Sequence, residues 1–364
     1  MNSRAIAVRP CPDEADGSTT LDPRLRDFSQ PWLDLNDRSV LITGGTGSFG
    51  KHFLRTVVAQ YKPRRLIVFS RDELKQSELA QDYTLERFPF IRFFIGDVRD
   101  RDRLDLALRD VDYIIHAAAL KQVPTAEYNP FECIRTNVFG AENIVTAALR
   151  RGVKRVVALS TDKAANPINL YGASKLASDK IFVAANNLAG GDGTSFSVVR
   201  YGNVFGSRGS VVPFFKKLAA EGAESLPITD PRMTRFWITL SQGVNFVLSS
   251  MEMMRGGEIF VPKIPSTTVS DLATLIGPRL VQKIVGVRPG EKLHETMIPA
   301  DDAHATLELD DRYVILQGYA DGVRSAYLHR GGKPVPDGFS YSSNTNPEKL
   351  DGRGLQALLQ AAYA

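Results

Sequence analysis

Short apolar runs alternate with longer segments of helical periodicity between Arg38 and about residue 205. Strands are expected where the runs are short, at 39–45, 65–70, 91–98, 111–119, 154–161 and 195–206. Helices are expected where apolar residues recur at helical spacing, at 49–61, 101–110, 137–152 and 171–189. Strands that alternate with helices in this way indicate βαβ units. The pattern therefore predicts an α/β fold with a Rossmann-type, doubly wound parallel sheet that is covered on both faces.

The pattern becomes irregular after about residue 206, although 236–254 keeps helical spacing and is expected to be a helix. Prolines punctuate the shorter elements of this part, at Pro213, Pro227, Pro231, Pro262, Pro265, Pro278 and Pro289. We therefore expect a smaller C-terminal lobe at 206–364 beside a Rossmann domain at 38–205.

The first 37 residues are polar and lack the basic start and apolar middle of a signal peptide. They are expected to form a poorly ordered or peripheral extension. Within "FSQPWLDL", Phe28, Trp32 and Leu33 are apolar residues in a polar context, so this segment is either a short docking segment or part of an untethered tail.

Composition and charge exclude several classes of protein. Of the 364 residues, 43% are hydrophobic and 24% charged, which is ordinary for a globular protein. The net charge of +4 is small, and there is no basic stripe with aromatics of the kind that nucleic-acid binders use. Cys11 and Cys133 form neither a metal spacing nor a disulfide framework, and no apolar run approaches a membrane span. We expect a cytoplasmic protein without metal, nucleic-acid or membrane partners.

A glycine-rich stretch, "TGGTGSFG" (43–50), follows the first strand and opens the first helix. Glycines in this position let the backbone approach a pyrophosphate, and the helix N-terminus offers free N–H groups and a positive dipole end. The turn is either purely structural or a dinucleotide site. In the second case the residues that bind the cofactor are Gly44, Thr46, Gly47, Ser48, Phe49 and Gly50.

The end of the second strand, "FSRDELK", bears on the choice of cofactor. A basic residue here accommodates the 2′-phosphate of NADP, whereas an acidic one holds the ribose hydroxyls of NAD. Arg71 comes first, Ser70 can donate a hydrogen bond and Lys75 lies a turn away, which favours NADP. Asp72 keeps NAD open.

Two further strand ends are expected to contact the cofactor. Asp97 and Val98 end the third strand, where a carboxylate can meet the adenine amino group. "HAAA" ends the fourth strand, where the small residues Ala117, Ala118 and Ala119 let a cofactor lie close. We interpret His116 as a packed strand residue rather than a functional one.

The stretch "LSTDKAANPINLYGASK" (159–175) carries the chemistry. Tyr171 and Lys175 are four residues apart, so they share one face of a helix. An ammonium beside a phenol stabilises the phenolate and is expected to lower the pKa of Tyr171 from about 10 toward neutrality. Such a tyrosine can accept a proton from a substrate hydroxyl while hydride leaves the same carbon. A second acid and base, Asp162 and Lys163, precede this pair and are not needed for hydride transfer alone.

With these motifs the sequence resembles the extended short-chain dehydrogenase/reductase superfamily, which has "TGGTGSFG", "HAAA", "YGASK" and "RYGNVFG" in this order. More narrowly, "SRDELKQSE", "HAAALKQVPTAEYNP", "LSTDKAANPINLYGASK", "DPRMTRFWITL" and "RPGEKLHETMIP" resemble the inverting UDP-N-acetylglucosamine 4,6-dehydratases, which open the route to pseudaminic acid in bacteria. The resemblance covers residues 38–317, excludes the N-terminal extension and is loose over the last part of the chain.

The resemblance implies a role for each group in 159–175. Tyr171 would deprotonate the C4 hydroxyl, Lys175 would tune Tyr171 and hold the nicotinamide ribose, and Thr161 would orient the C4 oxygen. Lys163 would be the base at C5, with a pKa lowered by burial and by the nearby cation, and Asp162 the acid at C6. The product would be UDP-2-acetamido-2,6-dideoxy-β-L-arabino-hex-4-ulose, with C5 inverted. A salt bridge at a strand end is the structural alternative for Asp162 and Lys163.

The resemblance also implies a substrate-binding role for the C-terminal lobe and a homo-oligomer, a dimer or a hexamer. Val204 and Lys121 would contact the cofactor, the latter also the substrate. The expected substrate-binding residues are Lys121, Asn203, Ser207, Arg208, Gly209, Ser210, Val211, Arg235, Arg288 and Glu291. Arginines suit diphosphate or ribose oxygens through bidentate contacts, and Glu291 suits ribose hydroxyls.

Sister enzymes built from the same parts remain alternatives, either a dehydratase that retains C5 or one that also epimerises other centres. One related group carries Met in place of Tyr171, so the intact Tyr argues against that group. A plain 4-epimerase or reductase would not need Asp162 and Lys163. A non-catalytic nucleotide-sensing protein on the same fold usually loses the Tyr or the Lys, and both are present here.

Overall fold

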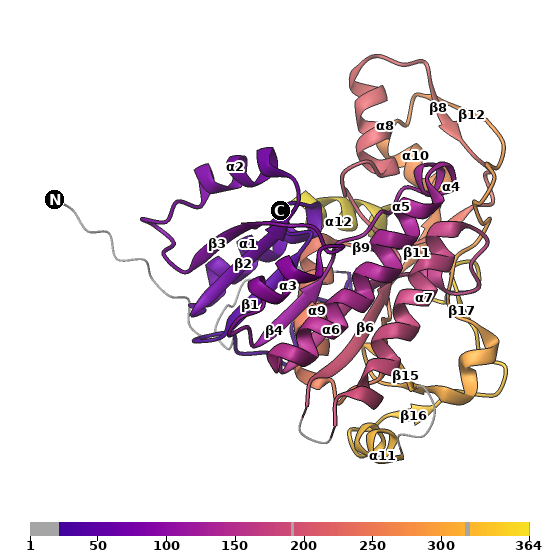
Figure 1. Ribbon diagram of the computed structural model, residues 1–364. Coiled ribbons are helices and arrows are strands. Elements are labelled where there is room, and N and C mark those ends of the chain that lie inside the picture. Colours follow the sequence, from indigo (N-terminus) through magenta and orange to yellow (C-terminus); the bar gives the residue numbers. More distant parts are fainter. Residues whose placement is uncertain (1–21, 191–192, 317–320, 364) are drawn as a thin grey trace, which may run out of the picture.

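The computed structural model describes residues 22–363 except 191–192 and 317–320. A ten-stranded sheet forms its centre (Figure 1). Seven strands are parallel, in the order β3 (Ile91–Ile95), β2 (Arg65–Ser70), β1 (Ser39–Thr43), β4 (Tyr113–His116), β5 (Arg155–Thr161), β6 (Ser195–Tyr201) and β10 (Glu258–Pro262). Antiparallel β15 (Arg312–Leu316), β14 (Thr306–Glu308) and β16 (Lys333–Pro334) extend it. The order reverses between β1 and β4, which is where doubly wound sheets bind ligands.

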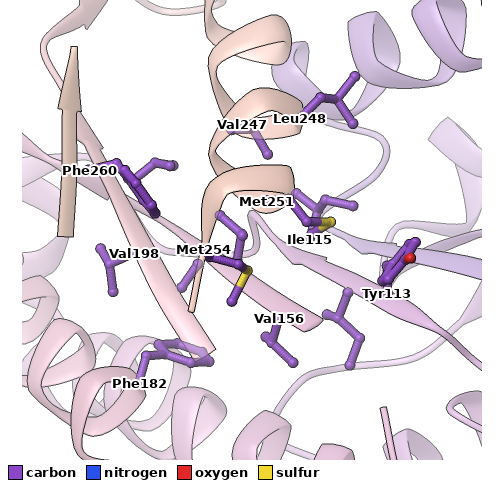
Figure 2. Close-up of a cluster of buried hydrophobic side chains, with 14 of the residues drawn as sticks. Tyr113, Ile115, Val156, Phe182, Val198, Val247, Leu248, Met251, Met254 and Phe260 are labelled. Atoms are coloured by element: carbon purple, nitrogen blue, oxygen red, sulfur yellow. The ribbon is translucent and has the colours of Figure 1, made fainter. Parts of the chain in front are cut away.

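Helices cover both faces of the sheet. On one face α3 (Arg101–Ala107), α6 (Gly140–Arg151) and α7 (Leu170–Ala184) pack side by side, and on the other α1 (Ser48–Gln60) packs against α9 (Leu240–Met253). Figure 2 shows Val247 and Met251 of α9 on one side of the strands and Phe182 of α7 on the other. These side chains are fully buried, as are Ile115 and Val156 between them. The two helix layers therefore share one continuous core with the sheet, which confirms the predicted fold class.

The remaining elements are mostly smaller. They comprise β7 (Asn203–Val204), β8 (Ser225–Ile228), β9 (Thr234–Ile238), β11 (Ser266–Thr268), β12 (Val281–Ile284), β13 (Thr296–Ile298), β17 (Tyr341–Ser342), α2 (Glu73–Asp82), α4 (Val123–Tyr128), α5 (Pro130–Ile134), α8 (Val211–Ala220), α10 (Val269–Ile276), α11 (Asp321–His329) and α12 (Gly352–Tyr363). One π-turn (Arg135–Phe139) joins α5 to α6, and 3₁₀ turns lie at Asp162–Ala164, Ala185–Leu188 and Ala300–Ala305. Strands β10, β14, β15 and β16 come from residues 206–364 yet belong to the main sheet. The domain division at residue 205 stays a prediction.

Two predicted elements differ in the structure. The helix expected at 236–254 begins only at Leu240, because Thr239 and Gln242 form a capping box there. The buried aromatic residues before it belong to β9. The strand expected at 195–206 divides into β6 and β7 around Gly202, where a Cβ atom would lie 2.5 Å from the Cβ of Phe236. Close approach of the two backbones therefore requires glycine at this position.

Residues 22–37, expected as part of a poorly ordered or peripheral extension, pack against α9. Phe28 is buried and meets Phe246 edge to face, with ring centroids 5.2 Å apart. The Gln242 side chain donates to the Arg26 carbonyl oxygen, and the Asn245 side chain donates to the Asp27 carbonyl oxygen. Residues 1–21 lie outside the described part. Buried apolar side chains and hydrogen bonds to its carbonyl oxygens hold residues 22–37 against α9. Of the two interpretations of "FSQPWLDL", the structure therefore agrees with the docking segment.

Candidate active site

A cavity of about 1250 Å³ lies at the carboxyl ends of the parallel strands. It is bordered by the glycine-rich turn, the start of α7 and the irregular C-terminal elements. Most predicted site residues line it: Gly44, Thr46, Gly47, Ser48, Phe49, Gly50, Ser70, Arg71, Asp72, Lys75, Asp97, Val98, Ala117, Ala118, Ala119, Lys121, Thr161, Lys163, Tyr171, Lys175, Asn203, Val204, Ser207, Gly209, Ser210, Val211, Arg235, Arg288 and Glu291. Of the predicted set, Asp162 and Arg208 lie off its wall.

The glycine-rich turn has the geometry of a phosphate cradle. Gly44 has φ +65°, and a Cβ atom there would lie 2.9 Å from the backbone nitrogen of Ala118. The first turn of α1 faces this cradle, and Gly47 caps the helix without a side-chain hydrogen bond. Backbone N–H groups at such a helix start have no partner within the helix. The residues present therefore fit a dinucleotide pyrophosphate.

Charged groups at the ends of β2 and β3 define the adenosine side of the cavity. The carboxylate of Asp72 caps α2 by accepting from the Lys75 backbone N–H, and it also pairs with the Lys75 ammonium. The Ser70 and Thr46 hydroxyls are hydrogen-bonded at 2.8 Å. Arg71 keeps 55% of its side chain exposed and lies 3.6 Å from Asp97. The acidic residue is thus engaged by its own helix, while the arginine stays accessible.

Tyr171, Lys175 and Asp179 form one half of the site and follow each other at intervals of four along α7. Asn169 caps this helix by accepting from the Gly172 backbone N–H at 2.7 Å. Burial raises the pKa of Tyr171 to about 12. The Lys163 ammonium and a hydrogen bond with Thr161 act in the opposite direction, but they do not outweigh burial. The sequence-based expectation that Lys175 brings this pKa toward neutrality is therefore wrong for the protein by itself. Burial, opposed by the charge of Asp179, lowers the pKa of Lys175.

Asp179 is a buried residue of this half that the sequence reasoning missed. Its Oδ2 accepts from the Ser160 hydroxyl at 2.8 Å and from the Arg200 guanidinium at 3.3 Å. Burial raises the pKa of Asp179, while Arg200 and Lys175 oppose this shift. Its position four residues beyond Lys175 on the same helix face was a usable signal.

Thr161, Asp162 and Lys163 form the other half at the end of β5. Asp162 is fully buried, and its Oδ1 accepts from the Thr161 hydroxyl at 2.9 Å and from Lys163 Nζ at 3.0 Å. Lys163 Nζ also lies 3.2 Å from Glu295 Oε1 and 3.5 Å from Asn203 Oδ1. Burial disfavours the ammonium, but the two carboxylates outweigh it and raise the pKa of Lys163. The expected lowering of this pKa is therefore wrong, because Lys163 has two anionic neighbours.

Glu295 was also missed. It lines the cavity just before β13, is 1% exposed and lies 3.8 Å from the guanidinium of Arg235. No local pattern in the sequence marks Glu295 as a site residue. Arg235 donates to the carbonyl oxygens of Thr234 and Lys292, so much of its hydrogen-bonding capacity serves the cavity wall.

The residues expected to grip the substrate lie at the open side. Arg288 and Glu291 form an ion pair of 3.8 Å, and 62% of the Arg288 side chain is exposed. Lys121 Nζ donates to the Arg208 carbonyl oxygen at 3.5 Å, and burial lowers the pKa of Lys121. Arg208 has an exposed side chain, and its backbone N–H donates to the Ser48 hydroxyl at 3.2 Å.

His116 has the structure of a packed strand residue. It is 1% exposed, its Nδ1 lies 2.9 Å from the Thr43 hydroxyl, and its ring packs against Phe182. Burial, aided by Lys175, lowers the pKa of His116 to about 3. In the described part of the chain, no group of three or more His, Cys, Asp or Glu residues is arranged to hold a metal ion. No helix among the same residues is long and apolar enough to span a membrane.

The nucleotide cradle and the Tyr171–Lys175 pair meet in one cavity at the carboxyl ends of a parallel sheet. This combination defines an extended short-chain dehydrogenase/reductase. The model of a polysaccharide biosynthesis protein family matches residues 40–317. An inverting UDP-N-acetylglucosamine 4,6-dehydratase from Campylobacter jejuni is 58% identical over 317 residues, which cover 86% of this chain and 94% of that protein. The chain belongs to the family of inverting UDP-N-acetylglucosamine 4,6-dehydratases within this superfamily.

More distant relatives have related names. A UDP-glucose 4-epimerase from Rickettsia canadensis is 40% identical over 330 residues, covering 89% of this chain and 95% of that protein. Among solved structures, Pen from Bacillus thuringiensis superposes with a TM-score of 0.82 at 34% identity, covering 90% of this chain and 99% of that one. DesIV, a dTDP-glucose 4,6-dehydratase from Streptomyces venezuelae with NAD and DAU bound, superposes at 0.61 with 26% identity, covering 70% and 86%.

Proposed function

We propose that this protein is a hydro-lyase that converts UDP-N-acetylglucosamine into the 4-keto-6-deoxy sugar with inverted C5. The observation that carries the proposal is the meeting, in one cavity, of a Tyr171–Lys175 pair with Lys163 and its carboxylates. The first pair suits oxidation at C4, and the second group suits proton transfers at C5 and C6. The 58% identity to a Campylobacter jejuni enzyme of this name supports the same conclusion.

A nicotinamide cofactor held by the glycine-rich turn and Lys175 would supply the redox chemistry, which is hydride transfer from C4 and back to C6. Tyr171 accepts the proton of the C4 hydroxyl, and Thr161, which is hydrogen-bonded to Tyr171, orients the C4 oxygen. Lys175 holds the nicotinamide ribose, while the Lys163 ammonium and the hydrogen bond with Thr161 favour the phenolate form of Tyr171. The buried carboxylate of Asp179, whose charge acts on Lys175, keeps the lysine in its ammonium form.

The 4-ketone acidifies the neighbouring C5–H bond, so a base on this chain can break it. Lys163, as a free amine, takes this proton, and the electron pair passes into the C4 carbonyl. The C6–O bond then breaks, and an acid of the Asp162–Lys163 pair delivers a proton to the leaving hydroxyl, which departs as water. Once C6 carries the returned hydrogen, a proton that exchanges with solvent adds to the opposite face of C5 and gives the inverted sugar.

We propose NADP as the cofactor. Support comes from the accessible side chain of Arg71 and from the engagement of Asp72 by α2 and Lys75. An arginine here suits the 2′-phosphate, which NAD lacks. The nucleotide released from the denatured protein should be NADP, and release of NAD alone would contradict this assignment.

The UDP moiety is proposed to lie toward Arg288, Glu291 and the 207–211 segment. Lys121 and Arg288 are cations at this side of the cavity, and Glu291 can accept from ribose hydroxyls. A homo-oligomer, a cytoplasmic location and a substrate-binding role for most of 206–364 complete the proposal. Light scattering of the purified protein tests the first, because a monomer mass would exclude a stable assembly.

Incubation with UDP-N-acetylglucosamine in deuterated water tests the function. The expected product is a 4-keto-6-deoxy sugar that carries deuterium at C5, and the C5 configuration read by NMR should be inverted. A product with retained C5 would point to the sister dehydratases. Unchanged substrate, or only its C4 epimer as the names of the Rickettsia relatives suggest, would overturn the proposal.

A further inference from the structure

Glu295 occupies a position that the proposed reaction leaves without a role. Its Oε1 lies 3.2 Å from Lys163 Nζ, while its Oε2 is buried and has no hydrogen-bond partner among the described residues. A buried carboxylate oxygen without a partner carries a large desolvation cost, so its retention calls for an explanation. Glu295 lines the cavity, and its carboxylate therefore lies at the boundary between the cavity and the core.

Asp162 does not fill the same position. It is fully buried, and its Oδ1 accepts from both Thr161 and Lys163. Its Oδ2 also has no hydrogen-bond partner among the described residues, but Asp162 lies off the cavity wall, whereas Glu295 lines it. The ammonium of Lys163 is therefore held between an inner carboxylate, Asp162, and a cavity-facing carboxylate, Glu295. Of the two carboxylates, Glu295 is the one whose residue lines the cavity.

The backbone around Glu295 is fixed by the C-terminal segment. The Glu295 N–H donates to the Ser343 hydroxyl at 2.9 Å, and the Ser343 N–H donates to the Glu295 carbonyl oxygen at 2.8 Å. The Ser343 hydroxyl also bonds Thr234, next to Arg235. Glu295 is thus as rigidly placed as a residue on a strand, which is a requirement for proton transfer at a fixed distance.

The charges around Lys163 create a need that Glu295 can meet. Besides Glu295, it is faced by Asp162 and Arg235, while Lys292 acts on both carboxylates. In this surrounding Lys163 rests as an ammonium and has no lone pair with which to act as a base. A base at C5 therefore requires that the Lys163 proton first moves to a neighbouring acceptor.

We infer that Glu295 is that acceptor, a residue that controls proton transfer at C5 by taking a proton from Lys163 and returning it. First the Lys163 N–H bond breaks and a Glu295 O–H bond forms. Lys163 then takes the C5 proton, and the electron pair of the broken C5–H bond passes to the C4 carbonyl. The C5 proton passes from the Asp162–Lys163 pair to the leaving hydroxyl, which departs as water, and the Glu295 O–H bond then breaks and returns its proton to Lys163. The inference rests on the proposed function and assigns a further residue to it.

The test separates C4 oxidation from C5 proton exchange in Glu295→Gln. Oxidation is followed by the near-ultraviolet absorbance of the reduced nicotinamide in a single turnover, and exchange by deuterium at C5. C4 oxidation should persist, while C5 exchange and water loss fall by about 10²–10⁴-fold, the usual contribution of a general base. Glu221→Gln at the exposed end of α8 is the control and should leave both steps unchanged.

Two results would overturn the inference: dehydration by Glu295→Gln at the wild-type rate, or equal loss of oxidation and exchange. Should Glu295→Gln not fold, Glu295→Asp carries the test, because it keeps a carboxylate but withdraws it by one methylene. It should slow exchange more than oxidation, and equal slowing would contradict a role at Lys163. Failure of the wild-type protein to dehydrate UDP-N-acetylglucosamine would instead refute the proposed function.

Discussion

The two halves of the site are built in opposite ways. Tyr171, Lys175 and Asp179 lie on consecutive turns of one helix, so local hydrogen bonds fix their spacing. Lys163 and its partners come from three segments far apart in the sequence, at the end of β5, in β9 and before β13. The first half survives small shifts of the C-terminal elements, whereas the second exists only when those elements are docked.

The halves also differ in charge. Lys175 is buried with a single anionic neighbour, Asp179, and burial lowers its pKa. Lys163 has two anionic neighbours, Asp162 and Glu295, and its pKa is raised. Lys175 therefore loses its proton more readily than an exposed lysine, and the Asp179 carboxylate opposes this loss. Lys163 holds its proton more tightly and requires an acceptor before it can act as a base. Two lysines in one cavity can in this way serve opposite purposes.

Lys163→Ala should have the largest effect on this contrast. Water loss should fall by about 10³-fold or more because the base at C5 is gone, while bound NADP and partial C4 oxidation persist. Tyr171→Phe should instead abolish oxidation and everything after it. Lys163→Arg keeps a cation between the carboxylates and is the matched control for folding. Full dehydratase activity of Lys163→Ala, measured by product formation, would remove Lys163 from the role of base.

Asp179→Asn should produce a smaller and opposite defect. Loss of the carboxylate withdraws an anion from Lys175, so C4 oxidation should slow by about 10–100-fold, as for other supporting residues. The pH at which oxidation declines on the alkaline side should also move lower, because the pKa of Lys175 falls further. Asp179→Glu should restore part of both. An oxidation rate and pH profile like the wild type's would show that Asp179 is only structural.

The smallest effect is expected for His116, which packs beneath the oxidation half. In the unfolded chain it takes up a proton below about pH 6.5, but the folded protein resists this until the pKa of about 3. Stability is thus fully present above pH 6.5 and is lost as the pH falls, by up to a few kcal/mol. Between pH 8 and pH 5, the free energy of unfolding measured with urea should decrease less for His116→Asn than for the wild type. An equal decrease in the two proteins would show that groups other than His116 cause the loss of stability in acid.

The sequence predicted the half of the site on α7 better than the half around Lys163. The parallel sheet, the glycine-rich turn and the Tyr171–Lys175 pair depend on local patterns of period two or four, and these were readable. Glu295 was missed because its partners are 132 and 60 positions away, at Lys163 and Arg235, and no local pattern records such pairs. The pKa directions of Tyr171 and Lys163 were mistaken because burial and neighbouring charges arise only in the folded chain.

The docking of Ser343 onto Glu295 has a consequence for how the protein is made. All groups of the oxidation half have been synthesised once α7 is complete, but Glu295 follows more than a hundred residues later. The strand that holds Glu295 in place, β17, comes later still. A growing chain therefore contains the side chains for oxidising a sugar long before it contains all of those for removing water. A segment synthesised more than 150 residues after α7 decides whether the first reaction can be followed by the second.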